Sequence, residues 1–174
     1  MIIGSRRAML LAAIAVIAIA IISLPLITLY TAPDMDKIVI TLSDVRAENI
    51  IDQNNTIDLG LSFSVYNPTD KALTTSKIEY RLYGNGILLG ENVLSYEDIP
   101  LNGRPQLLPN TNQTLSTLEP LRISLTSENQ PVINQIIDDK ERIKDIAWKT
   151  DGDAQIESAF SFTQKPFSSE IKMR

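Results

Sequence analysis

The feature that most constrains this chain is an uncharged, apolar run near its N-terminus, from Ala8 to Tyr30. Its 23 residues are mostly Ile, Leu and Ala. As a helix with a rise of ~1.5 Å per residue, the run would be roughly 34 Å long, which is enough to cross a hydrocarbon core of ~30 Å with some tilt. We therefore expect one N-terminal transmembrane helix over residues 8–30 that contacts the lipid bilayer directly.

A cleavable signal peptide is the alternative interpretation of the same run. The apolar region of such a peptide is usually about 7–15 residues and is followed by a small-residue cleavage site. Here the run is longer, and the only candidate site, Tyr30-Thr31-Ala32, is followed by Pro33. A retained anchor is therefore favoured over a cleaved peptide.

Charged residues on the two sides of the run predict its orientation. Arg6 and Arg7 precede it, whereas Asp34, Asp36 and Lys37 follow it. An excess of Lys and Arg before a span keeps the N-terminus in the cytoplasm. The expected parts are a cytoplasmic N-terminus (1–7), the membrane helix (8–30), a short linker (31–36) and a domain outside the cell membrane (37–174).

Composition narrows what the outer domain can do. Arg6 and Arg7 are the only charges before Asp34, so the rest of the chain carries 14 basic and 21 acidic residues, a net charge of −7. Such an acidic domain is a poor candidate for binding nucleic acid. The chain has no Cys, which excludes disulfides and zinc–thiolate sites, and no His, which removes the commonest general base and metal ligand. We therefore expect no enzyme activity, no catalytic residue and no cofactor.

Alternation of apolar and polar residues dominates the outer domain and predicts strands with one buried face. The clearest case is a run of five apolar residues at a strict period of two, which would all point to one side. Weaker alternation recurs over 38–43, 77–82 and 121–125. Asn67-Pro68-Thr69-Asp70 is expected to end the clearest strand, because Pro lacks the N–H that a sheet ladder needs. The five residues of that strand are Ile57, Leu59, Leu61, Phe63 and Val65.

Turn residues and one helical pattern complete the expected fold. Gly84-Asn85-Gly86 predicts a hairpin turn, and residues 98–112, with three prolines, predict loops and short edge pieces. Apolar residues at helical spacing over 131–145 predict one short amphipathic helix that begins at Pro131, with Asn129 or Gln130 at its cap. A closing hairpin is expected around Asp151-Gly152, with a second strand that carries Ile156, Phe160 and Phe162 on one face. The pattern as a whole predicts an antiparallel β-sandwich with one helix.

Residues 57–91 resemble the core of the group-two late-embryogenesis-abundant family, also called the water stress and hypersensitive response domain. The resemblance is carried by the alternating strand that ends in Asn67-Pro68-Thr69, the strand with Ile78-Glu79-Tyr80, the Asn85-Gly86 turn and the Leu89-Gly90 pair. The later strand 121–125, the helix and the closing hairpin extend it to roughly residues 37–171. The family implies a Greek-key-like β-sandwich with no cofactor and no established catalytic residues. Its members are associated with desiccation, stress tolerance and defence, and many carry one N-terminal membrane helix.

Few residues stand out as candidate sites. Asp151 and Asp153 could contribute to a calcium site, but calcium needs about 6–8 oxygen ligands, so a solvated turn is the favoured interpretation and no metal site is expected. Asn54 and Asn112 begin Asn-X-Thr sequons in expected outer loops and are possible glycosylation sites. The membrane helix has one candidate packing face, because small side chains at helical spacing let another helix approach closely. That face consists of Ala8, Ala12 and Ala15.

Three functions remain open from the sequence. The first is a non-enzymatic, membrane-anchored extracytoplasmic domain that binds or scaffolds a partner, with a stress- or envelope-related role. The second is an accessory subunit of a larger membrane protein complex, docked through the alanine face. The third is a lipid-binding or lipid-transfer domain in which the sandwich opens an apolar groove at the membrane surface.

Overall fold

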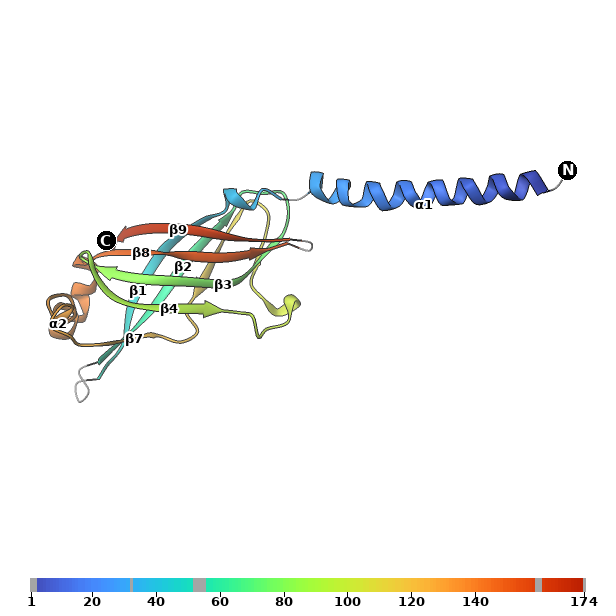
Figure 1. Cartoon of the computed structure of the whole chain (residues 1–174). Helices are drawn as coiled ribbons and strands as arrows, with labels where there is room; N and C mark the ends of the chain where they lie inside the picture. The colour runs from blue at the N-terminus through green and yellow to red at the C-terminus, as the bar shows by residue number, and fades with distance from the viewer. Residues whose placement is uncertain (1–2, 32, 52–55, 159–160, 174) are drawn as a thin grey trace. The chain divides into compact units, whose positions relative to one another are not determined.

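The computed structural model describes residues 3–31, 33–51, 56–158 and 161–173 of the chain. It divides into two compact units, Met1–Pro33 and Asp34–Arg174 (Figure 1). The boundary lies within the predicted linker, since Pro33 and Asp34 fall inside residues 31–36.

The first unit contains one helix, α1 (Ile3–Thr31), which includes the whole apolar run. Between Met9 and Ile22 its large apolar side chains are exposed. In the described part of the chain, no helix has the combination of length and hydropathy that a membrane span requires. The helix is therefore confirmed as a helix, and its place in a membrane stays a prediction.

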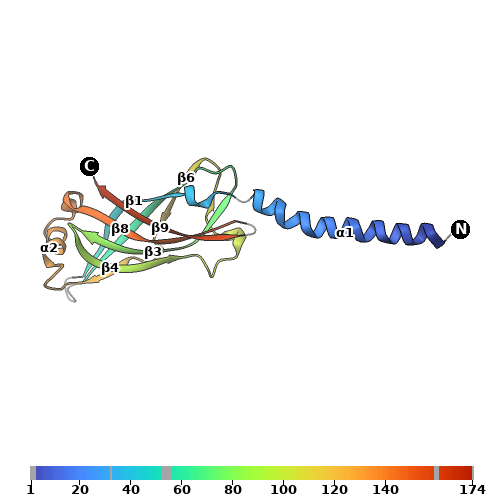
Figure 2. The same ribbon diagram turned by 45° about the horizontal axis from the view of Figure 1, so that its top comes forward.

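The second unit is built from two antiparallel sheets (Figures 1 and 2). The four-stranded sheet has the order β1-β2-β6, with β7 also paired to β2. The five-stranded sheet has the order β4-β3-β8-β9, with β5 also paired to β3. The strands are β1 (Val39–Ile51), β2 (Thr56–Asn67), β3 (Leu73–Gly84), β4 (Ile87–Ser95), β5 (Gln106–Leu107), β6 (Thr111–Ser116), β7 (Leu121–Ser124), β8 (Ala147–Glu157) and β9 (Phe162–Lys172).

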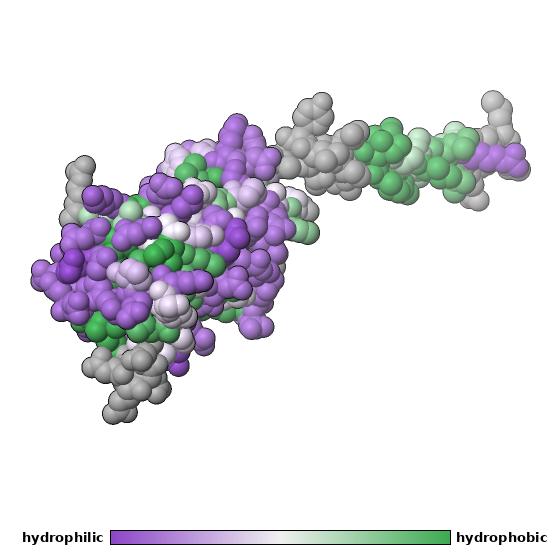
Figure 3. Space-filling model, turned by 60° about the vertical axis from the view of Figure 1, so that its left-hand side comes forward, coloured by the Kyte–Doolittle hydropathy of each residue, from purple (hydrophilic) through white to green (hydrophobic). Residues whose placement is uncertain are grey.

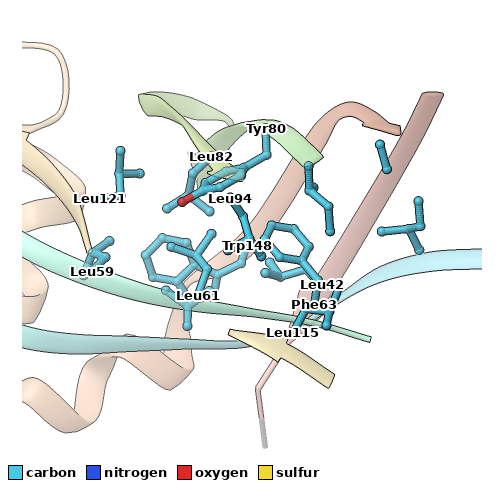
Figure 4. Close-up of a cluster of buried hydrophobic side chains, with 14 of the residues drawn as sticks. Leu42, Leu59, Leu61, Phe63, Tyr80, Leu82, Leu94, Leu115, Leu121 and Trp148 are labelled. Atoms are coloured by element: carbon cyan, nitrogen blue, oxygen red, sulfur yellow. The ribbon is translucent and has the colours of Figure 1, made fainter. Parts of the chain in front are cut away.

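The core lies between the inner faces of the two sheets (Figure 4). The five apolar residues of β2 predicted to share one face all belong to this core, and the residues between them from Asp58 to Ser62 are buried as well. The ring of Phe63 packs against Tyr80 of β3 and Phe167 of β9, with centroid distances of 5.1 and 6.0 Å. Trp148 is also buried, and its indole N–H donates to the carbonyl of Ile143 over 2.9 Å. Burial of each large side chain contributes about 1.5–3 kcal/mol, so these inner faces hold the sheets together.

The hairpin turn predicted between β3 and β4 is confirmed. Asn85 and Gly86 have φ angles of 50° and 82°, as a two-residue type I′ turn requires. The Asn85 amide oxygen also accepts a hydrogen bond of 2.9 Å from the Ala147 N–H. This side chain therefore fixes the start of β8 beside the turn.

The predicted helix over 131–145 is present but divided. α2 (Gln130–Asp138) has Asn129 at its cap, and a 3₁₀ segment, η4 (Lys140–Asp145), follows it. The two part at Asp139, whose φ of −154° is extended and whose carboxylate accepts from the Glu141 N–H. Other short 3₁₀ segments are η1 (Met35–Lys37) and η3 (Leu101–Gly103).

The closing hairpin was predicted at the wrong place. Asp151 and Gly152 lie in the middle of β8, which pairs with β3 on one side and β9 on the other. Gly152 is opposite Tyr80, and a Cβ atom on it would lie 2.0 Å from the carbonyl oxygen of Glu79. The glycine is thus explained by the close approach of two backbones and not by a turn. The hairpin occurs instead between β8 and β9, and Phe160 lies outside the described residues.

Replacement of Gly152 by Ala should force β3 and β8 apart. We expect the free energy of unfolding of the 34–174 fragment to fall by about 1–3 kcal/mol, the usual cost of overpacking. Urea denaturation followed by circular dichroism would measure it, with Ser168→Ala on the exposed face of β9 as the control. A neutral Gly152→Ala variant would contradict the close approach.

The Asn67-Pro68-Thr69 motif ends β2 and also forms a buried network of side-chain hydrogen bonds. Asn67 is fully buried, and its amide nitrogen donates to the carbonyls of Lys71 and Leu107, each over 2.8 Å. Its amide oxygen accepts from the N–H and the hydroxyl of Thr69. One side chain therefore fixes the β2–β3 turn and joins it to β5.

Asn67→Ala would leave buried carbonyl and N–H groups without partners, each of which costs about 1–3 kcal/mol. We expect the free energy of unfolding of the 34–174 fragment to fall by about 2–3 kcal/mol. The matched control is Asn112→Ala, because Asn112 is exposed on β6 and should change stability little. Equal urea midpoints for the two variants would show that the hydrogen bonds of Asn67 do not stabilise the fold.

Candidate functional site

A shallow hollow of about 620 Å³ lies on the outer face of the five-stranded sheet, over β3, β4 and β8. The register of these strands sets its side chains in two rows of three. One row is Val93, Glu79 and Asp153, and the next is Glu91, Arg81 and Asp151. We call this set the β3–β4–β8 hollow.

The hollow is predominantly acidic. Its two rows contain four carboxylates and one cation, and that cation, Arg81, forms an ion pair with Asp151 across the β3–β8 pair. At its margin, the ammonium group of Lys77 lies 2.7 Å from a carboxylate oxygen of Glu79, and this hydrogen bond raises the pKa of Lys77. The remaining carboxylates make the hollow suited to a cationic or hydrogen-bond-donating ligand.

One carboxylate oxygen of Asp151 has no donor. Its Oδ2 pairs with Arg81, whereas its Oδ1 is buried and has no hydrogen-bond partner among the described residues. A buried acceptor of this kind gains a hydrogen bond when a ligand N–H or O–H reaches it. The hollow is therefore suited to recognise a ligand that donates a hydrogen bond.

The calcium hypothesis gains no support from this arrangement. Asp151 and Asp153 do share one face of β8, but the strand replaces the expected turn. Across the described residues, no group of three or more Asp and Glu side chains is arranged to hold a metal ion.

Tyr80 belongs to the core beneath the hollow. Its ring points between the sheets, next to Leu82 and Leu94 (Figure 4). Burial raises the pKa of Tyr80 to about 12, with a smaller opposing effect from Asn92. The hydroxyl therefore remains protonated at neutral pH and does not serve as a base.

The outer face of the other sheet contains a buried acid that the sequence analysis did not single out. Asp58 of β2 is 1% exposed and accepts two hydrogen bonds, of 2.8 and 3.0 Å, from the guanidinium of Arg122 on β7. These bonds lower the pKa of Asp58, while burial acts in the opposite direction. The i, i+2 pattern of β2 could have placed Asp58 on the outer face, but only the register places Arg122 beside it.

A stability profile against pH should reveal this pair. Because the folded-state pKa of Asp58 is lowered, its contribution to stability is complete above the unfolded value of about 3.9 and is lost as the pH falls through the folded value. Arg122→Gln should therefore reduce the free energy of unfolding most at neutral pH, and the difference from the parent should shrink below about pH 4.

The control is Arg46→Gln, which breaks the exposed ion pair between Arg46 and Asp44. Exposed pairs contribute little, so this variant should stay close to the parent at every pH. If Arg122→Gln differs from the parent by the same amount at pH 3 and pH 7, then Asp58 is not the group that responds.

The other predicted site residues lie apart from the hollow. Asn112 is exposed, as a glycosylation site needs, but it lies on β6 and not in a loop. Asn54 falls outside the described residues. Ala8, Ala12 and Ala15 are all exposed on α1.

Comparison with known proteins shows the fold alone. No family model and no curated protein sequence matches the chain. A solution structure from Arabidopsis thaliana is 16% identical, with a TM-score of 0.51, and the match covers 77% of this chain and 80% of that one. A solution structure of a late-embryogenesis-abundant-like protein is 15% identical, with a TM-score of 0.43, over 97% of this chain and 86% of that one. A crystal structure of an Archaeoglobus fulgidus protein is 15% identical, with a TM-score of 0.39, over 77% and 98%.

Proposed function

We propose that this chain is a non-enzymatic binding domain of the group-two late-embryogenesis-abundant type, held at a cell membrane by α1. The domain lies outside the membrane, and its role is to bind or scaffold a partner in a stress- or envelope-related process. The motif series from Asn67-Pro68-Thr69 to Leu89-Gly90 supports the family assignment.

The observation that carries the anchoring is the apolar surface of α1. Nine of its large apolar side chains, from Met9 to Ile22, are each 54–75% exposed. Figure 3 shows this stretch as hydrophobic, whereas much of the visible face of the sandwich is hydrophilic. A helix that is apolar on all sides needs a bilayer or an apolar protein environment to cover it. The run of 23 uncharged residues supports a bilayer.

A binding role suits the sandwich better than a catalytic one. The hollow presents side-chain carboxylates from three paired strands, and it includes the Arg81–Asp151 ion pair. Such a surface recognises a partner by charge and hydrogen bonds.

A second candidate is an accessory subunit of a membrane complex. The observation that favours it is the alanine face of α1, which leaves room for a partner helix. Ala12→Leu would fill this face. If the assembly of this variant has a lower mass than that of the parent chain under native conditions in mild detergent, the result would support the subunit function.

The anchoring is tested by placing charge in α1. Ile14→Lys with Ile17→Lys should move the chain from the membrane fraction to the soluble fraction after alkaline extraction, because each Lys at a helix centre costs about 2.5–3.5 kcal/mol on insertion. The matched control is Ile14→Leu with Ile17→Leu, which should remain in the membrane. Retention of the double-Lys variant would contradict the proposal.

Orientation has a separate readout. In microsomes, an outside domain should be glycosylated at Asn112, and the mass increase should disappear with Asn112→Gln in an Asn54→Gln background. If the chain inserts and remains unglycosylated, the predicted orientation is wrong.

A further inference from the structure

We propose that β4 is a docking edge to which an extended, basic segment of a partner protein adds as a further strand of the five-stranded sheet. This deepens the proposed binding function, on which it rests, by naming the surface and the chemistry of the partner.

The edges other than β4 are protected. β9 contains Pro166, which a strand edge tolerates but which blocks further pairing, and its Ser169 hydroxyl accepts from the Leu42 N–H of β1 over 2.9 Å. β1 has two register shifts along its length, and β6 and β7 are short. Edges of these kinds are poor templates for another strand.

β4 is longer than β6 and β7 and has one register shift, at Leu89, but its residues 90–95 pair with β3 without a shift. Its nine residues include no Pro, Lys or Arg, and it ends the strand order with β3 as its only described strand partner. Two of its apolar side chains are exposed, Leu88 at 52% and Val93 at 47%. A strand of this length with an open, partly apolar edge is a site for strand addition.

The register identifies the backbone groups that face outward. The Tyr96 N–H donates to the Ser76 carbonyl over 2.8 Å. In an antiparallel pair every second residue is hydrogen-bonded to the neighbouring strand, so Leu94 and Asn92 are the next residues of β4 whose backbone groups bond to β3. The backbone groups of Glu91 and Val93 therefore point away from β3. In agreement, the Val93 N–H donates to the side-chain oxygen of Asn92, over 2.8 Å, and not to β3.

Charge specifies the partner. A residue paired with Glu91 or Val93 on an added strand would place its side chain on the same outer face, about 5 Å away, beside the β3–β4–β8 hollow. The carboxylates of Glu79 and Glu91 lie there, and the free oxygen of Asp151 lies farther in. Lys or Arg fits this position. A second copy of this chain fits poorly, because residues 34–174 carry a net charge of −7 and would repel the same residues of the second copy.

The test uses the full chain in a nonionic detergent and the peptide acetyl-Lys-Val-Lys-Val-Lys-Val-Lys-amide. When a lysine of the peptide is paired with Glu91 or Val93, its side chain points toward the hollow and its backbone N–H faces β4. Methylation of the backbone amide nitrogens of the lysine residues should therefore weaken binding about tenfold or more. Methylation of the backbone amide nitrogens of the valine residues should change the affinity less than about threefold. Calorimetry measures affinity, and slowed amide exchange at Glu91 locates the peptide.

A charge reversal separates strand addition from general attraction. Glu91→Lys should weaken binding of the Lys-Val peptide by about tenfold. Glu119→Lys, at an exposed position between β6 and β7, makes the same change in net charge and should leave affinity within about twofold.

Several results would overturn the proposal. One is no binding of the Lys-Val peptide, and another is equal binding of the two N-methylated peptides, which would mean attraction by charge alone. A dimer that Val93→Pro dissociates would assign the edge to a second copy. These outcomes are independent of the anchoring, because membrane extraction of the α1 variants is measured without the peptide.

Discussion

The close approach of β3 and β8 at Gly152 is the constraint on which most of this domain depends. Gly152 lies opposite Tyr80, and its lack of a side chain lets the two backbones come together. Tyr80 then packs against Phe63 of the other sheet. On the outer side, the same two strands hold Arg81 beside Asp151 and form the base of the hollow. One glycine thus serves the core on one face and the candidate site on the other.

The domain has no disulfide, and buried polar side chains hold its loops instead. Asn67 joins the β2–β3 turn to β5, and Asn129 joins the segment before α2 to the Thr126 N–H and the Ser124 carbonyl. Each of these amides is buried and has several partners, so its desolvation is offset by hydrogen bonds. The amides have the role that cross-links play in small secreted domains, and they need no oxidising compartment.

Periodicity explains how much of this could be predicted from the sequence. The inward face of β2 and the Asn85-Gly86 turn follow from local rules, because alternation and positive φ angles are properties of neighbouring residues. Gly152 was misplaced for the same reason, since an Asp-Gly pair favours a turn locally and only the position of Tyr80 shows otherwise. The hollow and the Asp58–Arg122 pair depend on register between distant strands, so no local pattern could reveal them.

The acidic character of the domain and its open edge are connected. An unprotected strand such as β4 would normally pair with another copy of itself, and natural proteins block this with Pro or with Lys. Here the blocking residues are absent from Ile87–Ser95, but carboxylates at Glu79 and Glu91 lie along the outer face next to the edge. Like charges disfavour self-pairing and leave pairing with a basic segment open. In the proposed docking, the same carboxylates therefore disfavour self-pairing and select a basic partner at this edge.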